Sequence, residues 1–288
     1  MTVCFLSTRL GLAFQTLRFP ALCLRVTSFC MDGTAWIDSG LSMEAARRIR
    51  NAVGEVSLLR QRLVSNPGLA AALDDIKRLQ SRRFSGTYAD LLRQGGPFEA
   101  GARFFLEELY SNKDYAARDS QFARIAGAIE RFFPAQVADT AVALAELHSL
   151  TEELDQAMAL AVLALPNESS FNRRYVLAWR KVGRQQDRVH QLHGVLQVGC
   201  EIIRLTRSST LRFTLKMMAK PATVAGLGTL QKFLETGFDT FAEMVRGGHA
   251  SIFLDLVAQR EAALADQLYT GELSACENTL SFYLDNAQ

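Results

Sequence analysis

The sequence has few helix-breaking residues and no long apolar run. Six prolines and 19 glycines occur in 288 residues, and most of them separate segments whose apolar residues recur at helical spacing. No run of about eighteen uncharged apolar residues is present, which argues against a membrane-spanning helix. No segment alternates polar and apolar residues as a half-buried strand does. These absences predict an all-α protein.

Cysteine and nucleotide motifs are also missing. Five cysteines stand at positions 4, 23, 30, 200 and 276 without any CxxC pair, so neither a zinc site nor a disulfide framework is indicated. Covalent haem attachment needs CxxCH, which is absent, as are the serine-hydrolase elbow, the P-loop and the dinucleotide fingerprint. We therefore expect no cofactor, and the cysteine usage favours a cytoplasmic location.

The composition is that of a folded domain. Hydrophobic residues make up 49% and charged residues 22% of the chain, which supports a buried core. Periodic segments joined by short loops predict an antiparallel multi-helix bundle of about nine helices. We place a single domain at residues 43–270, followed by a weakly patterned tail at 271–288. Ser85-Gly86 is expected to end one helix and Pro221 to open another.

Residues 1–42 differ from the rest and are expected to lie outside the fold. Residues 1–31 hold three cysteines and three arginines but no acidic residue. Such a composition is typical of an organelle transit peptide, whereas the interrupting arginines make a secretory signal a poorer match. A third interpretation, an extension with the natural start at Met31 or Met43, is preferred because regular periodicity begins only near Ser42.

Aromatic residues are concentrated between Phe84 and Phe133. This segment contains Phe104-Phe105-Leu106-Glu107-Glu108-Leu109-Tyr110, then Asp114, Arg118-Asp119 and Phe132-Phe133-Pro134. The combination resembles a family of uncharacterised bacterial all-helical proteins with an FFLEELY motif, and the similarity continues to Arg260-Glu261. The resemblance implies one helical domain of bacterial origin and transfers no functional site. The aromatic spacing itself predicts a helical hairpin with the rings in its interface.

Two carboxylates and one histidine are the candidate catalytic residues: Glu107, Asp119 and His148. Asp119 lies beside the Tyr115–Phe122 stripe, so it is expected to be partly buried and to need a basic partner. His148 follows Leu147 on the longest predicted helix and is expected to be a hydrogen-bonded core histidine. These residues form either a carboxylate site inside the bundle or a structural ion pair, and we favour the ion pair.

Asp187, His190 and His193 are weak candidates for metal ligands. Their three-residue spacing makes consecutive side chains neighbours on one helix face, and two imidazoles with a carboxylate are a partial ligand set. The surrounding sequence is polar and arginine-rich, and no fourth ligand is in view, so we expect no metal site. Cys200, further along the same helix, is expected to be a small buried apolar residue.

Charge is unevenly distributed although the net charge is only +2. Residues 134–166 carry five acidic and no basic residues, residues 167–220 eleven basic and three acidic, and residues 221–288 three basic and nine acidic. The basic part is a candidate surface for a polyanion, centred on Arg173, Arg174, Arg180, Lys181, Arg184 and Arg188. The near-neutral total favours packing of basic helices among acidic ones, so nucleic acid is not the expected partner.

Three functions remain compatible with the sequence. No motif assigns a reaction, so the leading interpretation is a non-enzymatic helical protein that binds a protein partner or itself through an aromatic-rich or charged face. A polyanion-binding module based on residues 167–220 is the first alternative. An enzyme or cofactor carrier with a pocket inside the bundle is the second.

Overall fold

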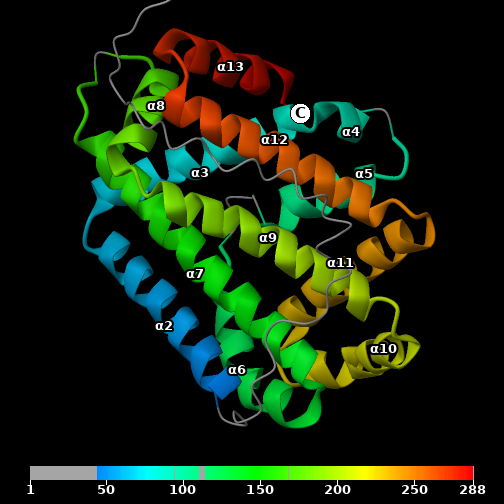
Figure 1. Cartoon of the computed structure of the whole chain (residues 1–288). Coiled ribbons are helices and arrows are strands. Elements are labelled where there is room, and N and C mark those ends of the chain that lie inside the picture. Colours follow the sequence, from blue (N-terminus) through cyan, green and yellow to red (C-terminus); the bar gives the residue numbers. More distant parts are fainter. Residues whose placement is uncertain (1–43, 94, 110–113, 168, 288) are drawn as a thin grey trace, which may run out of the picture.

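The computed structural model describes residues 44–93, 95–109, 114–167 and 169–287, and within them the chain forms helices and no strand (Figure 1). These ranges contain twelve α-helices and one π-helical turn. They are α2 (Glu44–Val64), α3 (Pro67–Thr87), α4 (Ala89–Arg93), α5 (Glu99–Phe104), η1 (Phe105–Leu109), α6 (Ala116–Phe132), α7 (Ala135–Leu163), α8 (Phe171–Val182), α9 (Gln185–Leu205), α10 (Ser209–Val224), α11 (Gly228–Arg246), α12 (Ala250–Thr270) and α13 (Leu273–Asn286). The all-α prediction is confirmed, whereas the expected number of about nine helices is too low. No helix in the described ranges is long and apolar enough to cross a membrane.

The longest helix, α7, lies at the centre of the packing. It contacts α2, α3, α8 and α9, and Figure 1 shows α2 along one side of it and α9 along the other. Its buried residues include apolar side chains such as Leu154 and Met158 as well as the polar Glu152, Asp155 and Gln156. A helix surrounded in this way has no single solvent face, so its buried polar groups need partners from other helices.

Two expected helix boundaries are wrong. Pro221 lies inside α10 rather than at the start of a helix, and its carbonyl accepts the N–H of Ala225 at 2.9 Å. Ser85-Gly86 does not end α3, which continues to Thr87 with both residues buried. Glycine is used at position 86 for close approach of α13, not for a turn.

The segment expected to be a tail is instead the helix α13. It packs against α3 and α8 and buries Cys276 and Leu280. With so few buried positions in fourteen residues, its apolar periodicity is too weak to be recognised from sequence. The C-terminal segment therefore belongs to the packed structure.

The aromatic segment supplies the centre of the largest apolar cluster. Phe104 and Phe105 are both buried. Phe105 is the first residue of the π-helical turn, which contains most of the FFLEELY motif. Phe104 contacts Phe233 of α11 at 5.9 Å between ring centroids, and Phe105 contacts Phe253 of α12 at 5.4 Å. Phe105 also stacks on Phe84 of α3 at 6.3 Å. The two rings therefore pack on distant helices as well as on α3. Tyr110, the last motif residue, lies outside the described ranges.

Candidate functional site

Asp119 is the centre of a buried polar cluster that joins three helices. Its Oδ2 accepts from Arg60 Nη2 of α2 at 2.6 Å and lies 3.0 Å from His148 Nε2 of α7. Asp119 itself stands in the first turn of α6, where the helix dipole favours a negative charge. The residue is only 4% exposed. The fold thus brings together two of the three candidate catalytic residues.

Arg118 extends the cluster toward α11 and the π-helical turn. Its Nη1 donates to the carbonyl oxygen of Glu108 at 3.2 Å, and its Nε lies 4.0 Å from Asp119 Oδ1. The guanidinium covers the rings of Tyr115 and Phe233, at 3.9 and 4.7 Å from their centroids. A cation held between two rings is a favourable contact in a water-poor site, so Arg118 links the start of α6 to two other elements.

The electrostatics of Asp119 favour a charged, structural carboxylate. Burial alone raises its pKa, but hydrogen bonds and charge from His148 and Arg60 outweigh burial, and the pKa lies below its ordinary value. A carboxyl group of this kind is ionised at neutral pH. The ring of Tyr115 lies edge-on to that of His148, with the two centroids 6.4 Å apart.

The lowered pKa of Asp119 predicts how acid affects stability. A depressed carboxyl pKa contributes stability above the unfolded-state pKa of about 3.9, and this contribution is lost as the pH falls through the folded-state value. Urea titrations of the wild type and Asp119→Asn from pH 7 downward should show a constant difference in unfolding free energy above about pH 5. The difference should shrink below about pH 4. A difference that grows on acidification would contradict the assignment.

Glu107 is not part of this cluster, which corrects the expectation that it shares a pocket with Asp119 and His148. Its side chain is 53% exposed and lies 3.8 Å from Arg103. Arg103 approaches Glu99 more closely, at 2.8 Å. Arg103 and Glu107 therefore meet on the surface, where such pairs contribute little.

The histidine row on α9 does not assemble a metal site within the described residues. No group of three potential ligands gathers there around a common point. Asp187 accepts instead from Arg184 Nε at 2.5 Å. Burial and the neighbouring His190 lower the pKa of His193, which favours its neutral form. Cys200 is buried in the apolar core, as expected.

The six basic candidates of residues 173–188 do not form an open surface. Four of them contact acceptors within the chain, as in Arg173–Glu277, Arg174–Asn167, Arg180–Leu268 and Arg184–Glu153. Lys181 is exposed, whereas Arg188 is buried. Arg173 and Arg184 are thus paired with acidic residues that follow and precede the basic segment, which weakens the case for a polyanion surface.

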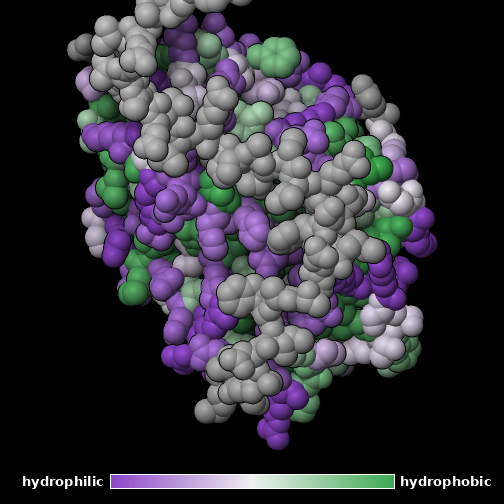
Figure 2. All heavy atoms as spheres, viewed as in Figure 1, coloured by the Kyte–Doolittle hydropathy of each residue, from purple (hydrophilic) through white to green (hydrophobic). Residues whose placement is uncertain are grey.

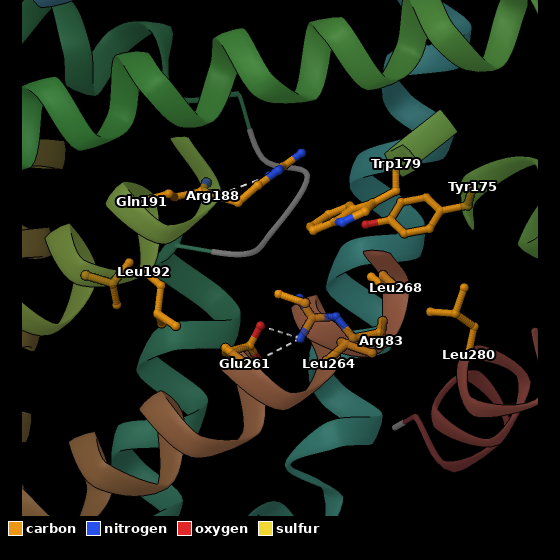
Figure 3. Close-up of a pocket in the computed structure, with 12 residues that line it drawn as sticks. Arg83, Tyr175, Trp179, Arg188, Gln191, Leu192, Glu261, Leu264, Leu268 and Leu280 are labelled. Carbon is orange, nitrogen blue, oxygen red and sulfur yellow. Dashed lines mark hydrogen bonds and ion pairs between the residues drawn. The ribbon is translucent and has the colours of Figure 1, made fainter. Parts of the chain in front are cut away.

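Arg188 lies instead at a cavity of about 60 Å³ between α3, α8, α9 and α12. Figure 3 shows Arg188 and Trp179 on one side of this cavity and the Arg83–Glu261 ion pair on the opposite side. Arg83 Nη1 donates to both carboxylate oxygens of Glu261, at 2.7 and 2.9 Å, and Tyr88 Oη donates to the same carboxylate at 3.1 Å. All of these side chains except the partly exposed Glu261 are buried.

Sequence reasoning missed Arg60, Arg83 and Glu261. Arg60 and Asp119 are 59 positions apart, and Arg83 and Glu261 are 178 apart. No local spacing rule connects such residues, because helical neighbours are only three or four positions apart. The one local signal for the cavity was the pair Tyr175 and Trp179, which are four positions apart on α8 and both line the cavity.

Fold and sites together define an all-helical domain in which buried ion pairs and hydrogen bonds connect helices that are distant in sequence. The chain belongs to the family described as "Domain of unknown function (DUF8198)", whose model matches residues 59–275. The matched range includes the whole Asp119 cluster and ends within α13. No curated protein and no solved structure matches the chain.

Proposed function

We propose that this protein is a non-enzymatic interaction protein whose partner docks on the outer face of α10. The observation that carries the proposal is the exposure of that helix: in sixteen residues α10 buries only Ala222. Most amphipathic helices bury an apolar stripe against the core and turn a polar face outward. In α10 the outward face is apolar as well.

Three large apolar side chains form the outer face of α10: Phe213, Met217 and Val224. They are 66%, 62% and 90% exposed, and their spacing of four and seven residues places them on one stripe. In Figure 2, apolar (green) and weakly polar (pale) residues gather at the lower right, where Figure 1 places α10. Exposed apolar side chains on one helix face are typical of interaction sites. Among the aromatic residues of 84–133 that suggested a binding face, Phe84, Tyr88, Phe104 and Phe105 are buried, and Phe132 is 74% exposed.

Charge favours an acidic partner over a second copy of α10. The chain has no acidic residue between Glu201 and Glu235. Arg212 is paired with Asp239 of α11 at 2.9 Å, while Lys216 and Lys220 are exposed beside the apolar stripe. Two α10 helices facing each other would bring like charges together, which is unfavourable. An acidic helix with an apolar stripe satisfies both features.

Site-specific cross-linking in the native host tests this proposal. A photoreactive phenylalanine at position 213 should capture a partner through an acidic peptide, because that side chain lies in the proposed interface. The same group at Phe282, which is 62% exposed on α13, is the matched control and should capture it far less. Charge reversal by Lys216→Glu with Lys220→Glu should weaken capture by about tenfold or more.

Three outcomes would contradict the proposal. Equal capture from positions 213 and 282 would indicate non-specific contact. Adducts only with peptides of this same chain, together with a concentration-dependent sedimentation coefficient, would replace the acidic partner by self-association. Capture that survives the double charge reversal would remove the electrostatic argument.

A further inference from the structure

Two residues that line the cavity beside Arg188 each have a buried donor without an acceptor. Arg188 Nη2 and Trp179 Nε1 have no hydrogen-bond partner, although the two residues are only 8% and 9% exposed. Their side chains are in contact, since the Arg188 guanidinium lies over the Trp179 ring at 4.3 Å from its centroid. Buried donors are almost always satisfied in folded proteins, so two adjacent exceptions on one cavity point to a missing acceptor.

The charges around the cavity favour an anionic acceptor. Arg83 is neutralised by Glu261, whereas Arg188 forms no ion pair within 4.0 Å in the described part of the chain and donates only to the neutral Gln191 at 3.1 Å. Asp155, which acts on Arg188 from α7, accepts from Gln80 at 3.0 Å, and burial raises its pKa. A buried guanidinium with a free N–H is thus available to a carboxylate or a similar anion.

Size and the remaining walls restrict that anion to a small one with an apolar end. The cavity of about 60 Å³ is less than half as large as the roughly 150 Å³ cavity that holds benzene in an engineered protein. Most of the other side chains that line it are apolar: Leu192, Val195, Leu264, Ala265, Leu268 and Leu280. Such walls suit a short hydrocarbon chain better than the additional charged oxygens of a phosphate.

We propose that the cavity binds a short-chain monocarboxylate of two or three carbons. The carboxylate accepts from Arg188 Nη2 and Trp179 Nε1, and the alkyl end contacts the leucines. This ligand site is separate from the α10 surface, and neither proposal depends on the other.

Titration of the full-length protein with sodium acetate and propionate at constant ionic strength tests the site. The chain has two tryptophans, so ¹⁵N-tryptophan labelling gives two indole signals, and Trp179→Phe assigns one of them. The Trp179 N–H signal should move downfield and saturate with a Kd of about 1 mM, a reasonable affinity for so few ligand atoms. Acetamide, the neutral analogue, should bind about tenfold more weakly.

Arg188→Gln should raise the Kd for acetate by about tenfold or more, because it removes the charge that the carboxylate meets. Arg204→Gln, also on α9, is the matched control and should leave the Kd unchanged. Calorimetric titration of acetate into Trp179→Phe, which keeps the ring contact and removes the N–H, should show weaker binding. It gives an independent readout should circular dichroism show that Arg188→Gln does not fold.

The proposal fails if acetate and propionate leave the Trp179 signal unmoved, or if Arg188→Gln binds them as the wild type does. It also fails if inorganic phosphate binds more tightly than both carboxylates. An unmoved signal combined with cross-relaxation from long-lived water to the indole N–H would show that water satisfies the two donors.

Discussion

Replacing Asp119 by alanine is expected to lower the free energy of unfolding by about 3 kcal/mol, since removal of one partner of a buried ion pair costs about 3–5 kcal/mol. The lower end applies because the Arg60 side chain is 26% exposed and can regain some water. His148 and Arg118 lose the same carboxylate and remain in the interior. Urea unfolding followed by circular dichroism measures the effect.

The control for this variant is Glu146→Ala. Glu146 pairs with Arg48 at 2.8 Å, and both side chains are 47% exposed, so its loss should cost at most about 1 kcal/mol. Both variants remove one carboxylate that bridges α2 to another helix, which makes them comparable. Equal losses of unfolding free energy in the two variants would show that burial does not make the Asp119 ion pair more stabilising than an exposed one.

Gly86→Ala is expected to destabilise the protein by about 3 kcal/mol, at the upper end for overpacking of a core. A Cβ atom on Gly86 would overlap the carbonyl oxygen of Tyr283 and lie 2.5 and 2.9 Å from its carbonyl carbon and Cα. Those atoms belong to the backbone of α13, which cannot rotate away as a side chain can. We therefore expect α13 to detach from α3 before the remainder of the fold is lost.

Limited proteolysis and thermal unfolding distinguish local from global loss. In Gly86→Ala, cleavage within Leu273–Asn286 should become fast while the remaining fragment resists, and the melting temperature should fall. Gly54→Ala is the matched control, because Gly54 also lies within a helix, and no atom lies within 4 Å of its added Cβ. It should stabilise the protein by about 0.5–1 kcal/mol. Unchanged protease resistance in Gly86→Ala would contradict the close contact between Gly86 and the backbone of α13.

The FFLEELY motif was only partly interpretable from sequence, because its first ring packs on a distant helix. The spacing of Phe98, Ala102 and Phe105 by four and three residues is that of one α-helical stripe, and Ala102 and Phe105 are buried. Phe104, one position off that stripe, is buried as well, because its ring meets Phe233 and Phe241 of α11. Local periodicity cannot predict a ring contact that is supplied from more than a hundred residues away.

The basic segment illustrates the same limit for charge. The sequence showed an excess of arginine in residues 167–220 and allowed either an open surface or mutual compensation. The choice depends on which acidic residue reaches each arginine, as Glu277 reaches Arg173 at 3.2 Å. Coulomb energy falls with distance and with exposure to water, so only the folded positions separate the two interpretations.

The sequence by itself determined the helical class, most helix positions and the residue types that carry charge, because apolar periodicity and helix punctuation act over only a few residues. Tertiary structure decided which of those residues meet. It joined Asp119 to His148 and Arg60, left Glu107 at the surface, and placed Trp179 and Arg188 on one cavity. The physical reason is that burial and pairing depend on contacts between helices far apart in sequence.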